Sequence, residues 1–173
     1  MDAFTALYSR KSTRDFAEMV PGDAFIEKIL NAGMAAPVGR SRYETMHLTV
    51  VSNYDLLQDI THIAADETSR NRAPFYGAPV VIFVSSNNER KDLRLSDTGC
   101  IIENMAVAAR ALGLASIYLW GFIAPMKEHP DLVARLNLPE GFEPISALGI
   151  GYAKQDLDTY SEPRHAIDVN YVK

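Results

Sequence analysis

The stretch APVVIFVSS at positions 78–86 is a continuous apolar run that ends in two serines. A strand that is apolar at every position has to be covered on both faces of its sheet, because a strand exposed on one face alternates apolar and polar residues. The run therefore predicts a central strand in a sheet that carries other elements on both sides.

Shorter patterns along the chain predict the elements around this strand. Three further strands are predicted at 46–52, 115–120 and 144–153. Helices, mainly indicated by apolar residues at helical spacing, are predicted at 2–8, 23–33, 54–66, 96–112 and 130–137. In the longest helix Ser96 is the expected N-cap. Together these elements predict a single α+β domain over residues 1–173, with three α/β/α layers and about four or five strands.

Composition argues against several functional classes. The 173 residues carry a net charge of −5, so a protein that binds nucleic acid through a basic surface is not expected. No apolar run reaches the length of a membrane span, and the N-terminal residues are too charged for a signal peptide. Cys100 is the only cysteine, which makes a reducing, cytoplasmic location the simplest expectation.

The segment SRKSTRDF, residues 9–16, is a basic exception in this acidic chain, because Arg10, Lys11 and Arg14 surround Ser12. If its backbone is extended, Arg10, Ser12 and Arg14 project to the same side. Guanidinium groups bind phosphate through paired hydrogen bonds, and a serine adds a short hydroxyl contact. The segment predicts a site for a small phosphate-bearing ligand; a solvated basic patch is the alternative.

Three later stretches add candidate ligand contacts. AAPVGRSRY (35–43) places two arginines in a connection between a helix and a strand. YLWGFIAP (118–125) ends a strand in Trp120-Gly121, where the backbone can approach a flat ligand. SEPRH (161–165) contributes Arg164. Their structural alternatives are, respectively, a polar connector, a strand end with core aromatics and a surface arginine.

No pattern predicts a metal centre or a catalytic side chain. The four histidines lack the spacing of metal ligands, and the sequence contains neither a nucleophile elbow nor a P-loop. Cys100 has no adjacent base, so a core thiol is a better interpretation than a nucleophile.

Taken in order, these stretches resemble the FMN-dependent nitroreductase family. RKSTRDF (10–16) is similar to the family pattern R-R-S-x-R-x-F, and APVG (36–39) is similar to the start of its A-P-S-G loop. GAPVVIFV (77–84) and DTGCIIENMAVAARALGLAS (97–116) resemble the family's next strand and its long helix. GIGYA and EPRH resemble its C-terminal patterns. The chain departs from the family at Val38 and in SRYET (41–45), where the family has Asn, Gln, Pro and Trp.

The resemblance implies a nitroreductase-like fold with a central, mixed but mostly antiparallel sheet flanked by helices. It also implies bound FMN, which carries the chemistry without a catalytic side chain. The residues implied to bind FMN are Arg10, Lys11, Ser12, Arg14, Pro37, Val38, Gly39, Ser41, Asn71, Trp120, Gly121 and Arg164. Those implied to line the substrate pocket are Arg40, Tyr43 and Phe122. Arg40, Arg42 and Tyr43 could favour an acidic or phenolic acceptor or merely contact solvent.

The implied activity is that of an NAD(P)H-dependent flavin oxidoreductase. NADH or NADPH would reduce the flavin at N5 in a ping-pong cycle, and an electron-poor small molecule such as a nitroaromatic or a quinone would then be the acceptor. Two alternatives stay open: a member that binds flavin or another ligand without turnover, which the altered SRYET loop motivates, and a flavoenzyme of the reductive dehalogenase type.

The resemblance also implies a homodimer with its flavin sites at the interface. The C-terminal residues Ile167, Val169, Tyr171 and Val172 are expected to form a late edge strand, exchanged with the partner subunit.

Overall fold

The computed structural model describes residues 1–68 and 74–173 of the chain. The helices are α1 (Ala3–Ser9), α2 (Asp23–Met34), α3 (Tyr54–Thr68), α4 (Lys91–Ala111), α5 (Ile123–Lys127) and α6 (Pro130–Ala134). The 3₁₀ turns are η1 (Gly39–Ser41) and η2 (Tyr43–Thr45), and the strands are β1 (Met46–Val51), β2 (Val80–Ser86), β3 (Ala115–Leu119) and β4 (Glu143–Gly151).

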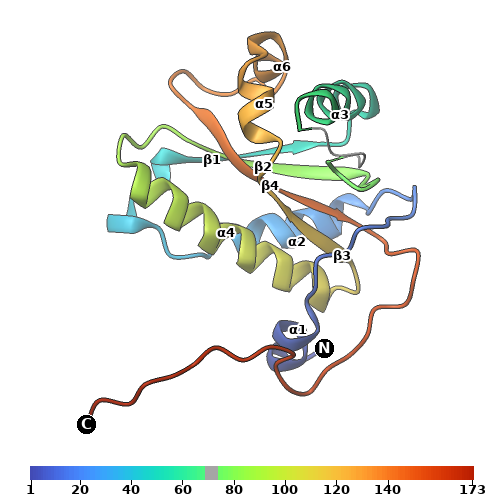
Figure 1. The fold of residues 1–173 in the computed structure, drawn as a ribbon, viewed down its shortest axis with the longest axis vertical. Helices are drawn as coiled ribbons and strands as arrows, with labels where there is room; N and C mark the ends of the chain where they lie inside the picture. The colour runs from blue at the N-terminus through green and yellow to red at the C-terminus, as the bar shows by residue number, and fades with distance from the viewer. Residues whose placement is uncertain (69–73) are drawn as a thin grey trace.

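The elements form three layers, with the sheet in the middle (Figure 1). Helices α2 and α4 cover one face, and α3, α5 and α6 cover the other. Helix α1 and the C-terminal tail lie beyond one end of the body, and the tail runs outward from there. Within the described residues, no helix combines the length and hydropathy needed to cross a membrane. The α+β architecture predicted from the sequence is confirmed.

The sheet has the strand order β1-β2-β4-β3, and all three pairings between these strands are antiparallel. The central strand β2 lies between β1 and β4, as its apolar run predicted. The only parallel element among the described residues is an isolated bridge between Ser12 and Ser116, so the sheet is less mixed than the resemblance implied. Strand β3 is an edge strand of the sheet.

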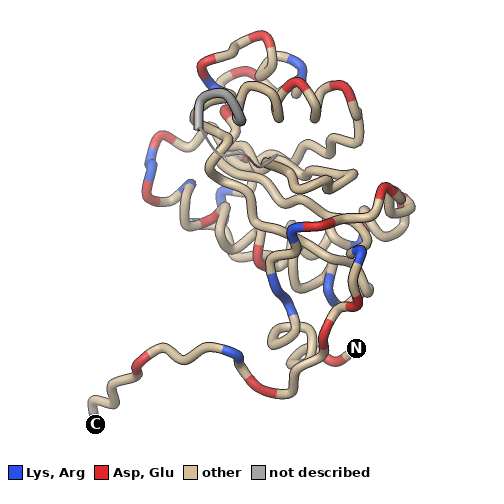
Figure 2. The backbone as a smooth tube through the Cα atoms, turned by 45° about the vertical axis from the view of Figure 1, so that its right-hand side comes forward, with Lys and Arg blue, Asp and Glu red and all other residues tan. Residues whose placement is uncertain are grey.

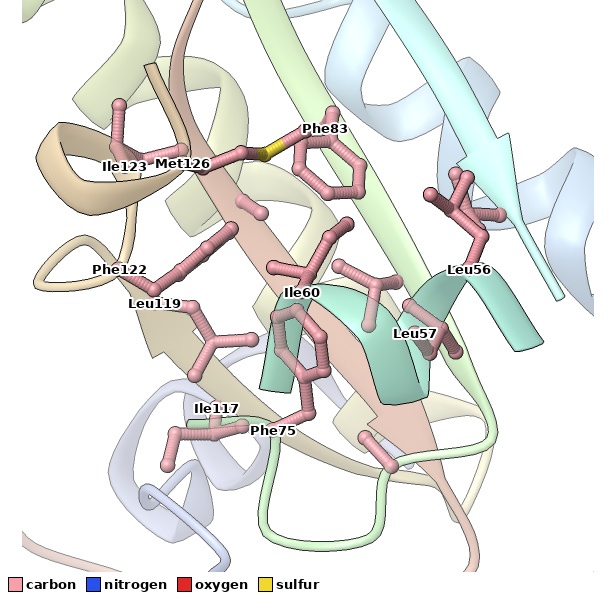
Figure 3. Close-up of a cluster of buried hydrophobic side chains, with 14 of the residues drawn as sticks. Leu56, Leu57, Ile60, Phe75, Phe83, Ile117, Leu119, Phe122, Ile123 and Met126 are labelled. Carbon is pink, nitrogen blue, oxygen red and sulfur yellow. The ribbon is translucent and has the colours of Figure 1, made fainter. Parts of the chain in front are cut away.

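The core has two halves because β2 supplies side chains to both faces. Val81 and Phe83 pack with α3 and α5, whereas Val80, Ile82 and Val84 pack with α2 and α4. Figure 3 shows the first half, in which side chains from α3, β3 and α5 form one apolar cluster with Phe83 of β2. This two-sided burial explains why the strand is apolar throughout.

Helices α2 and α4 approach closely at Gly33. A Cβ atom at this position would lie 2.7 Å from Met105 Cγ, so a side chain would force the helices apart. The sequence placed Gly33 at the end of its helix, and α2 indeed ends one residue later, at Met34.

Three elements differ from the prediction. Helix α4 begins at Lys91 with Arg90 as its N-cap, not at Ser96, because Lys, Leu and Arg are good helix formers and Asp92 lies in the first turn, where a carboxylate suits the helix dipole. Helix α5 was not predicted; it contains Pro125 in its first turn, where proline is tolerated. The tail after residue 153 forms no strand within this chain, so strand exchange stays a prediction.

Candidate functional site

The basic segment, residues 10–16, lies in extended form against the start of β3. Arg10 leaves α1 with φ −61° and ψ 127°. The Thr13 N–H donates to the Ser116 carbonyl at 2.9 Å, next to the Ser12–Ser116 bridge. Phe16 is 3% exposed and anchors the segment in the core. The extended backbone inferred from the sequence agrees with this arrangement.

The cations of this segment meet α4 and the C-terminal tail. Arg10 Nε lies 3.0 Å from Glu103 Oε1, and Lys11 Nζ lies 2.5 Å from Asp158 Oδ2. Arg164 donates from Nη2 to the Arg10 carbonyl at 2.8 Å, so the structure brings these distant residues together. Figure 2 shows basic and acidic residues on both segments where they meet.

The tail contact also sets the charge state of Asp158. The hydrogen bond from Lys11 holds the pKa of the Asp158 carboxyl below its ordinary value. Asp158 is therefore ionised at neutral pH and can hold Lys11 in place.

Several donors of the basic segment remain available to a ligand. The side chains of Ser12 and Arg14 are exposed, and the Arg14 guanidinium lies 5.9 Å from the ring centroid of Tyr76. Arg10 Nε is shielded from solvent and faces Glu103, so the exposed donors are those of Ser12 and Arg14. Thr13 Oγ1 is also shielded from solvent and has no hydrogen-bond partner among the described residues. A bound anion would satisfy such a donor, because buried polar groups are normally paired.

Arg110 is a buried cation that the sequence analysis missed. It lies on α4, is 6% exposed, and donates from Nη2 to the Asp158 carbonyl at 2.8 Å. Its Nε atom has no partner among the described residues. The available signal was an arginine inside the apolar pattern AVAARALG, which is unusual on a buried helix face. Arg110 holds the tail beneath the basic segment.

Beyond Ser116, the outer edge of β3 has no neighbouring strand in the part of the chain that the structure describes. Tyr118 and Trp120 are 52% and 66% exposed along this edge, and Gly121 is exposed after them. The distance from Ser116 to Gly121 is about 17 Å of extended chain, at ~3.3 Å per residue. An elongated ligand could therefore lie between the basic segment and Gly121.

Phe122 does not share this exposure. Its ring is 3% exposed and packs edge-to-face against Phe75 and Phe83, with centroid distances of 4.9 and 5.7 Å. The side chain that the sequence analysis assigned to a substrate pocket therefore lines the core in this structure (Figure 3).

The loop at residues 37–41 is fixed to the first half of α4. The Gly39 N–H donates to Asp97 Oδ1 at 2.9 Å. Arg40 and Ser41 have φ values of 58° and 55°, in the left-handed region that is costly for residues other than glycine. Two consecutive residues held in this conformation suggest that the loop shape matters for function.

The remaining predicted residues of this region differ in exposure. Pro37, Arg40 and Ser41 are exposed, whereas Val38 is 8% exposed and packs in the core. The Tyr43 hydroxyl donates to the Ala36 carbonyl at 3.3 Å. Asn71 lies outside the described residues.

This loop and the basic segment do not meet within one chain. The loop contacts α4 at Asp97, and the backbone of the basic segment lies beside Arg110 and Ser116 near the other end of that helix. Thirteen residues of α-helix separate Asp97 from Arg110, which corresponds to about 20 Å.

Comparison with known proteins shows the family of this chain. The model of the nitroreductase family matches residues 7–152. A protein of Archaeoglobus fulgidus, named "Putative NADH dehydrogenase/NAD(P)H nitroreductase", is 28% identical over 157 residues, which is 89% of this chain and 87% of the relative.

Two solved structures have the same fold. A nitroreductase with bound FMN from Desulfitobacterium hafniense DCB-2 is 26% identical, with 100% of both chains covered and a TM-score of 0.87. A second, from Bacteroides fragilis NCTC 9343, is 24% identical, with 99% of this chain and 100% of that chain covered and a TM-score of 0.81. With a family match over most of its length and this likeness of fold, the chain belongs to the nitroreductase family.

Proposed function

We propose that this protein is an FMN-dependent NAD(P)H oxidoreductase that reduces an electron-poor small molecule such as a nitroaromatic or a quinone. The observation that carries the proposal is the position of the basic segment at one end of an open strand edge, with exposed Trp120-Gly121 at the other end. Family membership and the bound FMN of the Desulfitobacterium hafniense structure support it.

The residues of the site fit FMN. Thr13 Oγ1 is a donor without a partner among the described residues, Ser12 and Arg14 are exposed beside it, and Arg10 is held nearby by Glu103, which suits a phosphate and the polyol chain attached to it. Gly121 has no side chain to keep a flat ring from the backbone. The open edge between them supplies the length that such a ligand needs.

The roles of the side chains follow from this placement. Arg10, Lys11, Ser12, Arg14 and Arg164 would hold the phosphate and ribityl chain. When bound, FMN would supply the redox chemistry, the passage of two electrons from NAD(P)H to the acceptor, while these side chains hold the cofactor in place.

The dimer is part of the same proposal. Pro37, Val38, Gly39 and Ser41 would reach the flavin of the partner subunit, as the resemblance to the family implies, since they contact α4 toward its start whereas the basic segment lies beside its later part. The tail supports this assignment, since Ile167, Tyr171 and Val172 are 90%, 84% and 96% exposed in a single chain. Covering them against a partner would remove this apolar surface from water.

The first experiment is an absorbance spectrum of the purified protein, followed by anaerobic addition of NADH and of NADPH. We expect a flavin spectrum that bleaches with at least one of the two nucleotides. A protein that binds FMN but is not bleached by either would instead be the binding-only member of the family. A protein that ignores added FMN would contradict the assigned cofactor site.

A second experiment tests the dimer. Removing residues 166–173 leaves Arg164 in place and deletes the exposed apolar tail. We expect light scattering to show a dimer for the full chain and a weaker or absent dimer for the shortened chain, with lower FMN affinity. A full-length monomer that retains FMN would contradict the shared site.

A further inference from the structure

A hollow of about 360 Å³ opens beside Trp120, where the start of α4, the β3–α5 turn and the start of β4 meet. Its apolar lining comes from Leu95, Ile123 and Ile145. Trp120 and Gly121 belong both to this hollow and to the open edge of β3. The hollow therefore adjoins the end of the proposed flavin site that lies farthest from the basic segment.

Three cations line the same hollow, namely Lys91, Arg94 and Lys127. Arg94 and Lys127 share one carboxylate: Glu143 accepts a hydrogen bond from Arg94 Nη1 at 2.6 Å and another from Lys127 Nζ. Lys91 forms no ion pair with any residue that the structure describes. The hollow thus combines an excess of positive charge with an aromatic and aliphatic wall.

Neighbouring acidic groups do not cancel this excess. Asp92, which follows Lys91 in the chain, is engaged by Arg90 at 2.5 Å. Glu143 is already held by two cations, and its hydrogen bond from Lys127 keeps its pKa below the ordinary value of a glutamic acid. Lys91 is therefore the cation that a ligand can meet without first breaking an ion pair.

We propose that this hollow binds the anionic group of an electron-poor aromatic acceptor, such as a nitroaromatic or quinonoid carboxylate or sulfonate. The ring would pack against Trp120 and Leu95, and the anion would meet Lys91, with Arg94 behind it. The inference rests on the proposed function, which places the flavin ring beside Gly121. A neutral acceptor would gain only the apolar contact, whereas an anion also gains the attraction of nearby cations in a partly shielded site.

The size of the hollow favours an acceptor over the phosphates of the nucleotide donor. About 360 Å³ accommodates one substituted ring system, at the lower end of the range for small-molecule pockets. A dinucleotide would extend well beyond it. The phosphates of NADH or NADPH are nevertheless a second anionic group that these cations could bind, and the experiment below tests the nucleotide separately.

Trp120 is the only tryptophan of the chain, so its fluorescence reports directly on this hollow. The purified full-length protein, with FMN added, is titrated with para-nitrobenzoate and with nitrobenzene, which share a ring and differ in charge. We expect para-nitrobenzoate to bind at least threefold more tightly. In Lys91→Glu this ratio should fall to one or below, and in Lys28→Glu, which changes an exposed lysine on α2 outside the hollow, it should be retained.

Lys91→Glu should fold normally, because a carboxylate in the first turn of α4 interacts favourably with the helix dipole. Equal affinities for the two probes in the wild type, or an unchanged ratio in Lys91→Glu, would overturn the proposal. A titration with NAD⁺ tests whether the hollow binds the nucleotide donor instead. If Lys91→Glu lowers only the affinity for NAD⁺, the cations bind the nucleotide and the acceptor assignment is wrong. The quenching does not require turnover, so a protein that NAD(P)H fails to bleach would contradict the proposed function while leaving this ratio measurable.

Discussion

Cations lie near both ends of β3, but those near its start are held by other residues of the chain, whereas Lys91 near its end is not. At the start, Arg10, Lys11 and Arg164 are engaged by Glu103, Asp158 and the Arg10 carbonyl, which fixes them before any ligand arrives. At the other end, Lys91 faces a hollow without an ion pair among the described residues. Preorganised cations suit a group that stays bound, because little ordering remains to be done, whereas a freer cation suits ligands that exchange.

The largest effect is expected from removing the preorganised cations. Arg10→Ala combined with Arg14→Ala deletes two charge-assisted contacts to the phosphate, each worth about 1.5–3 kcal/mol. We therefore expect the dissociation constant of FMN to rise by at least about a hundredfold. Flavin fluorescence during titration of the apoprotein measures it.

The matched control is Arg135→Ala, which removes an exposed arginine paired with Asp59 on the opposite layer. It should bind FMN as the wild type does. Full retention of flavin by the double variant would show that the basic segment is only a charged surface.

The anchor beneath the basic segment gives the next effect. A Cβ atom at Gly151 would lie 2.6 Å from Pro79 Cδ and 3.1 Å from Phe16 Cδ1, and neither ring can bend away. Gly151→Ala should lower the free energy of unfolding by about 1–3 kcal/mol, as overpacked cores do. Because Phe16 would shift, FMN affinity should fall as well, whereas the hollow at the other end of β3 should keep its preference for para-nitrobenzoate.

Gly99→Ala is the control for this substitution, because a Cβ atom at this position in α4 meets nothing within 4 Å. It should be neutral or stabilise the helix, since alanine is the better helix former. Chemical denaturation measures the free energy of unfolding of both variants. A Gly151→Ala protein as stable as Gly99→Ala would contradict the packing argument.

The difference between the two ends also explains what could be predicted from the sequence. The continuous apolar run of β2 and the clustered cations of residues 10–14 are local patterns, and both the strand and the extended segment are present. The hollow is formed by α4, α5 and β4, which are distant in the chain, so no local pattern points to it. Arg110 was missed for a similar reason, because its partners are carbonyls of a tail that folds back from residues 157–158.

The predicted site residues also differ in how the structure places them. Arg164 was predicted to contact the phosphate through family resemblance; its side chain donates to the Arg10 carbonyl, and its role toward a phosphate stays a prediction. Phe122 was predicted to line a substrate pocket, whereas the chain turns after β3 and sends the ring into the core. The direction in which a single side chain points after a turn depends on tertiary packing, which a local sequence pattern does not predict.

The loop at residues 37–41 offers a smaller and more local test. Asp97→Ala removes the acceptor of the Gly39 N–H and should lower stability by about 1 kcal/mol. Asp97→Asn keeps a side-chain oxygen at this place and should cost less. If the loop reaches the partner's flavin, Asp97→Ala should also weaken FMN binding in the dimer. Equal stability and equal FMN affinity of the two variants would contradict a role of this loop in the flavin site.

The smallest effect is expected at Glu143, which joins Arg94 to Lys127 beside the hollow. The hydrogen bond from Lys127, followed by that from Arg94, lowers the pKa of this carboxyl in the folded protein. A lowered folded-state pKa contributes stability above the unfolded-state value, about 4.3, and that contribution is lost as the pH falls through the folded-state value. Glu143→Gln should therefore lower the melting temperature at neutral pH by at most a few degrees, because a half-exposed ion pair is weak.

Melting curves of the wild type and Glu143→Gln between neutral and strongly acidic pH test this assignment. The difference in melting temperature should shrink as the pH falls below about 4, where the wild-type carboxyl also becomes neutral. High salt should reduce the neutral-pH difference as well, since screening weakens exposed pairs. A difference that stays constant with pH and salt would mean that Glu143 acts through packing, and the charge of the hollow would then have to be attributed to Lys91 alone.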